Sequence, residues 1–405
     1  AKNMQRHHQN LIADLKDKEK IRIVFLVIHA SVWKIDSVFK RMLEDPFFEP
    51  EILVCPYIAF GENRMLEDME QAYTYFKGKN YSVRKALKND GSWLKIEELK
   101  PDIVFFTNPH DLTIPEYYKY AYMNYLSCYV PYHHEVGSYM DDIDQYDQLF
   151  HNTMWLIFSP HTYSYEIFRN ISQAKGENVF VTGYPMLEES FGIKNSGKGN
   201  FWKNNDKRLR VIWAPHHTID SPELPYSNFL KYAEDIQQLS LKYKDSIVWS
   251  FKPHPILKSK LYEHPQWGKH RTDTYYSFWE KESFTQLDLG EYIDLFAQSD
   301  AMIHDSGSFL AEYLYFNKPV LYIMAEENNL NFFNDFGKKA LKSCRIATNL
   351  SEIEMFITGL VNHSIKEITD THADFYNQEL KIYFNEQSPS EKIICKIKQE
   401  LNYDL

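Results

Sequence analysis

The chain has 405 residues, which exceeds one typical hydrophobic core and predicts two domains. Its formal net charge of −11 argues against a general nucleic-acid scaffold and means that anionic ligands must be met by local clusters of donors. The four cysteines are widely spaced and lack a CxxC pair, which fits a reducing compartment. With no long apolar stretch and no visible signal peptide, we expect a cytoplasmic protein.

Short, continuous apolar runs in the first half are typical of buried parallel strands. The predicted strands are Ile21–Ile28, Glu51–Val54, Tyr81–Val83, Ile103–Thr107, Leu126–Pro131, Met154–Phe158 and Val179–Val181. The helices predicted between them are Val32–Leu43, Asn63–Phe76, Trp93–Leu99 and His161–Asn170. This alternation predicts a Rossmann-like domain over residues 1–185. No GxGxxG follows the first strand, so dinucleotide binding is not indicated.

The loop after the strand Leu126–Pro131 carries the strongest base candidates of this half. It contains His133 and His134, placed where open α/β sheets form their sites. Imidazole titrates near neutrality and can take a proton from a hydroxyl nucleophile. We predict that His133 or His134 is catalytic, and the pattern does not choose between them. The alternative is one buried, hydrogen-bonding histidine beside an exposed one.

An acidic run nearby, Asp141–Asp144, contains a DxD pattern of the type that can hold a metal on nucleotide phosphates. It follows no apolar strand and lies in an acidic, tyrosine-rich segment, so a solvated face or a helix start is the favoured interpretation. We therefore predict no metal ligands.

The second half repeats the alternation and predicts another Rossmann-like domain over residues 186–380. The predicted strands are Arg208–Ala214, Ser246–Lys252, Ala301–His304 and Val320–Ile323, and the predicted helices include Ser227–Lys242, Tyr275–Glu282, Tyr292–Gln298 and Phe309–Phe316. Residues 381–405 form a predicted helical tail that packs back on the N-terminal domain. The predicted fold is α/β, with two Rossmann-like domains facing across a cleft in a glycosyltransferase-B architecture.

Three strand ends of the second half carry side chains suited to an anion. They are His216 and His217, then Lys252 and His254, and then Asp305, Ser306, Gly307, Ser308 and Glu312. Because parallel strands end at one edge of a sheet, we expect these residues to converge on a nucleotide diphosphate. The alternative is a set of ordinary capped turns.

Each of these loops has a local rationale. Prolines on both sides of His254 stiffen its backbone. Gly307 is expected to permit a turn that other residues resist, and Ser308 to cap a helix whose N-terminus attracts phosphate. Glu312 is placed to accept hydrogen bonds from ribose hydroxyls. Since the helix dipole and basic side chains neutralise the diphosphate, we expect neither a metal nor another cofactor.

Four segments together resemble the CDP-glycerol glycerophosphotransferase family, whose members build wall teichoic acids, capsules and other surface polymers. They are VTGYP (Val181–Pro185), IWAPHHT (Ile212–Thr218), FKPHP (Phe251–Pro255) and SDAMIHDSGSF (Ser299–Phe309). The resemblance implies a CDP-alcohol donor, a polymer or lipid-linked acceptor, and peripheral attachment to the inner face of the cell membrane. It matches the family's donor-site histidine to His254, its serine turn to Asp305–Ser308, and, loosely, its base loop to Tyr132–Glu135.

The expected activity is the transfer of a glycerol-phosphate-type group from a CDP-activated donor to an acceptor hydroxyl. Two other enzymes on the same fold remain open. One is a glycosyltransferase that uses a nucleotide sugar. The other is a UDP-N-acetylglucosamine 2-epimerase, because the stretch DSGSFLAEYLYFNKPVL (Asp305–Leu321) of this chain resembles the donor-binding segment of those enzymes. A non-catalytic partner in a polymer-synthesis complex is a third possibility.

Overall fold

The chain forms two compact units. The computed structural model describes residues 2–192, 200–222, 224–324 and 327–402. Unit 1 comprises Ala1–His134, Met140–Glu188 and Tyr383–Leu405, and unit 2 comprises Glu135–Tyr139 and Glu189–Ile382. Residues 403–405 of the predicted tail lie outside the described residues.

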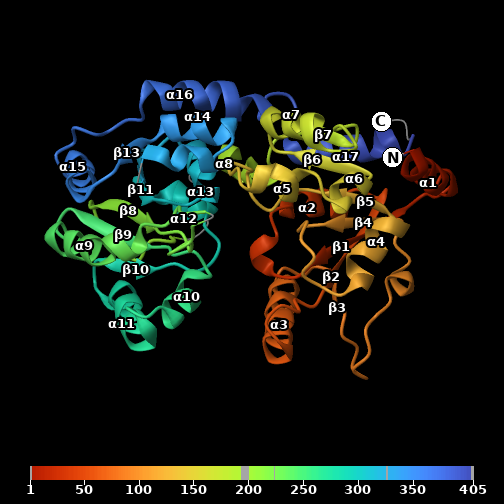
Figure 1. The fold of residues 1–405 in the computed structure, drawn as a ribbon, viewed down its shortest axis with the longest axis horizontal. Coiled ribbons are helices and arrows are strands. Elements are labelled where there is room, and N and C mark those ends of the chain that lie inside the picture. The colour runs from red at the N-terminus through yellow and green to blue at the C-terminus, as the bar shows by residue number, and fades with distance from the viewer. Residues whose placement is uncertain (1, 193–199, 223, 325–326, 403–405) are drawn as a thin grey trace. The chain divides into compact units, whose positions relative to one another are not determined.

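Unit 1 is built on a parallel sheet with the order β3-β2-β1-β4-β5-β6-β7 (Figure 1). Its strands are β1 (Ile21–Val27), β2 (Phe48–Val54), β3 (Val83–Lys85), β4 (Ile103–Phe106), β5 (Leu126–Tyr129), β6 (Leu156–Ser159) and β7 (Val179–Val181). Burial is nearly continuous along the central strands, because a parallel sheet is covered on both faces. All seven strands predicted for this half are present, with ends shifted by a few residues.

The helices of unit 1 connect these strands. They are α1 (Lys2–Asp14), α2 (Asp36–Glu44), α3 (Glu62–Gly78), α4 (Lys119–Asn124), α5 (Ile143–Tyr146), α6 (Leu149–Thr153), α7 (Thr162–Ile171) and α17 (Pro389–Glu400). A short helix, α8 (Glu188–Gly192), begins at the residue where the chain passes from unit 1 to unit 2. The helix predicted over Trp93–Leu99 is wrong, since only Ile96–Leu99 forms a 3-10 turn. Trp93 instead pairs with Leu87 in an antiparallel bridge, which holds its backbone extended.

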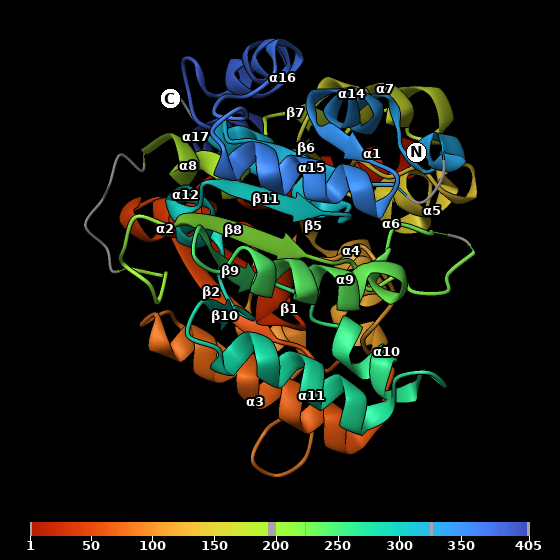
Figure 2. The ribbon, with the colours of Figure 1, turned by 90° about the vertical axis from the view of Figure 1, so that its left-hand side faces the viewer.

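Unit 2 contains a second parallel sheet, with the order β10-β9-β8-β11-β12-β13. Its strands are β8 (Leu209–Ala214), β9 (Ile247–Phe251), β10 (Thr285–Leu287), β11 (Ala301–His304), β12 (Val320–Ile323) and β13 (Arg345–Ala347). Figure 2 shows β8 and β11 side by side with their arrows running in the same direction. The helices are α9 (Phe229–Lys242), α10 (Leu257–Glu263), α11 (Gly268–Lys281), α12 (Ile293–Gln298), α13 (Ser308–Glu312), α14 (Asp335–Ser343), α15 (Leu350–Val361) and α16 (Asp370–Phe375).

Both sheets share the strand order of doubly wound domains, in which the chain first builds outward in one direction and then returns to build in the other. The reversal lies between β1 and β4 in unit 1 and between β8 and β11 in unit 2. Ligands of such sheets bind beyond the carboxyl ends of the strands at this switch point. In unit 2 the two flanking loops are those that follow β8 and β11, which contain His216, His217 and Asp305–Ser308.

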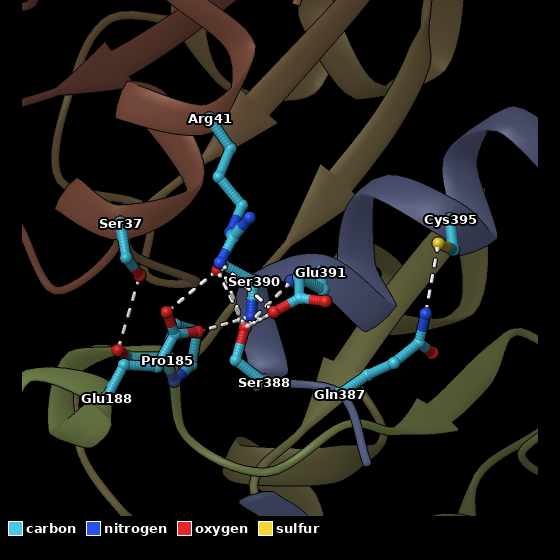
Figure 3. A network of polar contacts seen from close by, with 9 residues as sticks. All are labelled: Ser37, Arg41, Pro185, Glu188, Gln387, Ser388, Ser390, Glu391 and Cys395. Atoms are coloured by element: carbon cyan, nitrogen blue, oxygen red, sulfur yellow. Dashed lines mark hydrogen bonds and ion pairs between the residues drawn. The ribbon is translucent and has the colours of Figure 1, made fainter. Parts of the chain in front are cut away.

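The C-terminal helix α17 belongs to unit 1 and is fastened by the polar network in Figure 3. Ser390, fully buried, accepts a hydrogen bond from Arg41 Nε at 2.5 Å and donates from Oγ to Glu188 Oε2 at 2.8 Å. The Ser390 amide also donates to Glu188. Burial raises the pKa of Glu188, and these two hydrogen bonds from Ser390 oppose the rise. The network ties residues far apart in the sequence into one unit.

Replacing Ser390 with alanine should therefore lower the free energy of unfolding by about 1–3 kcal/mol, because it removes the buried hydroxyl that accepts from Arg41 Nε and donates to Glu188 Oε2. The measurement is thermal or urea denaturation of the purified chain. Gln399→Ala, an exposed change in the same helix, is the matched control and should be close to neutral. Equal stability of the two variants would show that the network contributes nothing.

Candidate functional site

The loops after β8, β9 and β11 meet at the carboxyl edge of the unit 2 sheet. These three strands are direct neighbours in the order β9-β8-β11 and run parallel. The predicted convergence of the three strand ends is thus confirmed. The functional roles predicted for their side chains stay predictions.

Three histidines from two of these loops form a cluster. One ring nitrogen from each of His216, His217 and His254 lies within 4.8 Å of the others. The ring centroids of His254 lie 5.2 Å from those of His216 and 4.3 Å from those of His217. Burial, followed by the neighbouring His217, holds the pKa of His216 well below its usual value, and burial and Lys260 lower the pKa of His217 to about 4. His216 and His217 are therefore neutral imidazoles near pH 7.

Asp305 holds the loop of His216 in place through hydrogen bonds. It is fully buried, and its Oδ1 accepts from the His216 amide at 2.8 Å while its Oδ2 accepts from the backbone and side-chain N–H groups of Asn228. Burial raises its pKa to about 7, and these N–H donors oppose the rise. Asp305 thus joins the ends of β11 and β8 and the start of α9. This geometry supports a structural role and leaves the carboxylate little surface for a ligand.

The turn after β11 differs from its sequence-based description. Gly307 has φ −73°, an ordinary helical value, so the expectation of a special backbone conformation is wrong. A Cβ at this position would instead meet the Tyr226 ring at 3.3 Å, which makes close packing the reason for glycine. Ser308 is not the cap, because the helix begins at Ser308 and the Ser306 hydroxyl accepts from the Phe309 amide at 3.3 Å. With five residues, α13 has only a small dipole to offer.

Lys252 and Glu312 lie deeper in the same unit and are linked through Tyr292. Lys252 donates from Nζ to the Gly290 carbonyl at 2.8 Å and lies over the Tyr292 ring at 5.2 Å. The Tyr292 hydroxyl donates to Glu312 Oε2 at 2.6 Å, and Glu312 is fully buried. This position does not support the predicted contact of Glu312 with a ribose hydroxyl. Lys252, also buried, directs its ammonium group to Gly290 and Tyr292.

In unit 1, His133 is the more accessible of the two base candidates. It is half-buried in the loop after β5, and its ring lies 4.8 Å from that of Tyr132. The Tyr132 hydroxyl in turn lies 3.4 Å from His110 Nε2, in the loop after β4. Burial and then the nearby His110 lower the pKa of His133 to about 4. His133 is therefore neutral near pH 7, the form that accepts a proton.

His134 faces the interior of unit 1. It is 1% exposed, and its ring packs against those of His161 at 5.6 Å and Tyr184 at 5.2 Å. Its carbonyl lies 3.1 Å from His161 Nε2. Burial, followed by His161, holds its pKa well below the usual range. The contacts of His134 are those of a packing residue.

Two residues that the sequence pattern did not single out complete the histidine cluster. Lys260 of α10 places Nζ 2.7 Å from His217 Nδ1, and Thr218 places Oγ1 2.9 Å from His216 Nδ1. Thr218 follows the histidine pair directly, so its position was a usable signal. Lys260 was not readable in this way, because α10 was not predicted and its contact with His217 depends on the fold.

The many buried histidines predict that the protein is sensitive to acid. Burial is the largest cause that lowers the pKa from 6.5 to about 3–4 in a group of residues, namely His8, His133, His151, His217 and His304. Between these pKa values the folded state binds fewer protons than the unfolded state, so stability rises with pH through this window and is lost as the pH falls. Asp305, with its raised pKa, makes stability fall as the pH rises between about 4 and 7, but it is one group against five histidines.

The thermal midpoint should accordingly fall by about 10 °C or more between pH 7 and pH 4.5, measured by scanning fluorimetry or calorimetry at constant ionic strength. A midpoint that stays constant or rises as the pH is lowered to 4.5 would contradict this expectation.

Comparison with known proteins relates these features to a family. The model of the family described as CDP-Glycerol:Poly(glycerophosphate) glycerophosphotransferase matches residues 132–331, which include the base loop, the histidine cluster and the serine turn. No curated protein sequence matches the chain. Within the described residues, no helix is both long enough and apolar enough to cross a membrane.

Solved structures with similar folds cover nearly the whole chain. A UDP co-structure of S. aureus MnaA is 15% identical, with a TM-score of 0.58 over 96% of this chain and 98% of that one. The wall teichoic acid polymerase TagF, in a variant form, is 13% identical, with a TM-score of 0.59 over 99% and 98%. The same TagF variant soaked with CDPG is 13% identical, with a TM-score of 0.55 over 98% and 96%. At such low identities the likeness concerns the fold.

The two parallel sheets and these structural relatives confirm the predicted pair of α/β domains of the glycosyltransferase-B class. The family match covers the residues on which the sequence resemblance was based, and it extends from the base loop through the serine turn. Over residues 132–331, about half of the chain, the sequence matches the CDP-glycerol:poly(glycerophosphate) glycerophosphotransferase family.

Proposed function

We propose that this enzyme transfers a glycerol-phosphate-type group from a CDP-activated donor to a hydroxyl of a surface polymer or of a lipid-linked acceptor. The family match supports the donor class and the type of transfer. The structural observation that carries the proposal is the cluster of His216, His217 and His254 at the switch point of unit 2, where a doubly wound sheet binds its ligand.

The proposed reaction is an in-line displacement at phosphorus. The acceptor hydroxyl oxygen bonds to the β-phosphorus of the donor, the anhydride bond to the α-phosphate breaks, and CMP leaves with that bonding pair. The acceptor proton passes to the imidazole of His133, which we favour over the buried His134. His254 and Ser306, together with Ser308, stabilise charge on the transferring and leaving phosphates. Positioned donors of this kind commonly supply the largest catalytic term.

The acceptor and the membrane contact are the finer parts of the proposal. We infer that the enzyme works on an acceptor at the inner face of the cell membrane and attaches to that face peripherally. Sedimentation with acceptor-free vesicles of anionic lipid, compared with zwitterionic vesicles, tests attachment independently of catalysis.

The activity itself is tested by supplying CDP-glycerol with a glycerol-phosphate primer and measuring CMP release and primer extension. Dependence of CMP release on the primer is the expected result. Consumption of UDP-N-acetylglucosamine without an acceptor, or transfer of a sugar from a nucleotide sugar, would replace this assignment with the epimerase or the glycosyltransferase. If no nucleotide stabilises the protein in a thermal-shift panel of CDP, UDP, GDP and CMP, the enzymatic assignment fails.

A further inference from the structure

The histidine cluster has the spacing of a possible metal site, but the contacts of its Nδ1 atoms decide which nitrogen carries the proton. A neutral imidazole has one N–H donor and one acceptor nitrogen. When Nδ1 accepts a hydrogen bond, the proton is on Nε2, and Nε2 is then a donor and not a ligand. Metal-binding histidines show the reverse pattern, in which the second nitrogen donates to a carbonyl or a carboxylate.

Thr218 determines the tautomer of His216. Its Oγ1 accepts hydrogen bonds from the amides of Tyr226 at 3.2 Å and Ser227 at 3.1 Å. A hydroxyl has two lone pairs and one hydrogen, so after these two bonds its hydrogen is what it offers to His216 Nδ1, 2.9 Å away. His216 therefore accepts at Nδ1 and carries its proton on Nε2.

The other two histidines are set in the same way by different donors. The ammonium group of Lys260 has donors and no acceptor, so its contact at 2.7 Å makes His217 Nδ1 an acceptor. The Ile256 amide donates to His254 Nδ1 at 3.2 Å. The three Nδ1 partners are thus a hydroxyl, an ammonium and an amide. Each of them directs the proton of its imidazole to Nε2.

We propose that Thr218 and Lys260 are positioning residues that hold His216 and His217 as Nε2–H tautomers, so that the cluster presents N–H donors to a phosphate-type anion and not lone pairs to a divalent cation. This inference rests on the proposed function, since the diphosphate of the CDP-activated donor is the anion it would take. Lys260 also contributes a positive charge beside the cluster, which attracts an anion and repels a metal ion.

The protein offers a matched pair of variants for the test. Lys260→Met removes the donor at His217 Nδ1, and Lys260→Arg restores one. Lys258→Met makes the same charge change on the same helix, α10, but Lys258 contacts Asp273 and the rings of Tyr262 and Tyr276. Comparing the two methionine variants separates the loss of the Nδ1 contact from the loss of one positive charge.

The first measurement is the tautomer of His217 at pH 7.5, read from long-range ¹⁵N–¹H correlation spectra of the full chain and assigned with the His217→Gln variant. We expect the proton on Nε2 in the unchanged protein and a mixture of tautomers in Lys260→Met. The second measurement is the affinity for inorganic pyrophosphate by calorimetry. It should fall about tenfold or more in Lys260→Met, return in Lys260→Arg and change little in Lys258→Met.

Several results would overturn the inference. They are a proton on Nδ1 of His217 in the unchanged protein, equal pyrophosphate affinity in Lys260→Met, an equal loss in Lys258→Met, and a stoichiometric Zn²⁺ ion that competes with pyrophosphate. These readouts need no turnover. If the tautomers and the pyrophosphate binding are as expected but the protein does not turn over CDP-glycerol, only the proposed function is rejected. If the enzyme turns over CDP-glycerol and the Lys260→Met variant does so equally fast, only the positioning role is rejected.

Discussion

We expect the His133→Ala variant to turn over a CDP-activated donor about 10³-fold more slowly than the unchanged enzyme, because general base catalysis is typically worth 10²–10⁴-fold. His133 is half-buried in the loop after β5, next to Tyr132, and its lowered pKa keeps the imidazole neutral and ready to accept a proton. The measurement is kcat for CMP release with saturating primer. The pH dependence should also change, since a base that titrates in the unchanged enzyme is no longer present.

The matched control is His134→Gln. His134 is 1% exposed and packs against His161 and Tyr184, so its replacement should lower the thermal midpoint while the folded enzyme retains much of its kcat. The assignment of the base would reverse if His133→Ala turned over normally while folded His134→Gln had lost its activity. Loss of kcat in both variants at unchanged stability would assign the proton transfer to the pair.

The strands and their order of appearance were readable from the sequence because parallel strands buried on both faces are continuous apolar runs. IRIVFLVI and RLRVIWA leave few alternatives, and each is followed by polar residues at the edge where such sheets bind ligands. The convergence of His216, His217 and Asp305 therefore followed from topology alone.

Side-chain pairing could not be read in this way. Asp305 pairs with Asn228, 77 residues away, and this contact, which supports a structural role, depends on the fold. The helix α10 and the strand β10 were missed because each is short, and Pro253 and Pro255 interrupt the pattern before α10. Gly307 was predicted to be glycine because of its backbone freedom. The structure shows instead that the ring of Tyr226, from a distant loop, excludes a side chain at this position.

A protein with a net charge of −11 that binds a diphosphate must provide hydrogen-bond donors at the binding site itself. The histidine cluster provides such donors with few charged groups. His216 and His217 are neutral near pH 7, so they donate hydrogen bonds without the mutual repulsion of two adjacent imidazolium ions. Lys260 supplies a positive charge at the border of the cluster, where its Nζ lies 2.7 Å from His217 Nδ1. Such donors are already oriented before the ligand arrives, which is the condition for electrostatic stabilisation of a transition state.

The His254→Ala variant should lose about 10²-fold in kcat, because one preorganised donor to the transferring phosphate is typically worth this much. Pro253 and Pro255 restrict the backbone on both sides of His254, and the Ile256 amide at 3.2 Å from Nδ1 leaves the Nε2–H as the donor. Because the interaction strengthens as charge develops at phosphorus, the loss should appear in kcat more than in KM.

The control for this variant is His264→Ala, at the far end of α10, where the imidazole contacts Asp220 at 2.7 Å. Its turnover should remain close to that of the unchanged enzyme. His254→Gln, whose side-chain amide still carries an N–H donor, should recover part of the lost rate. A rise in KM at constant kcat would reduce His254 to a residue that binds the ground state. Near-normal kcat and KM in His254→Ala would remove it from the mechanism, and the anion would then have to be stabilised by Ser306 and the remaining two histidines.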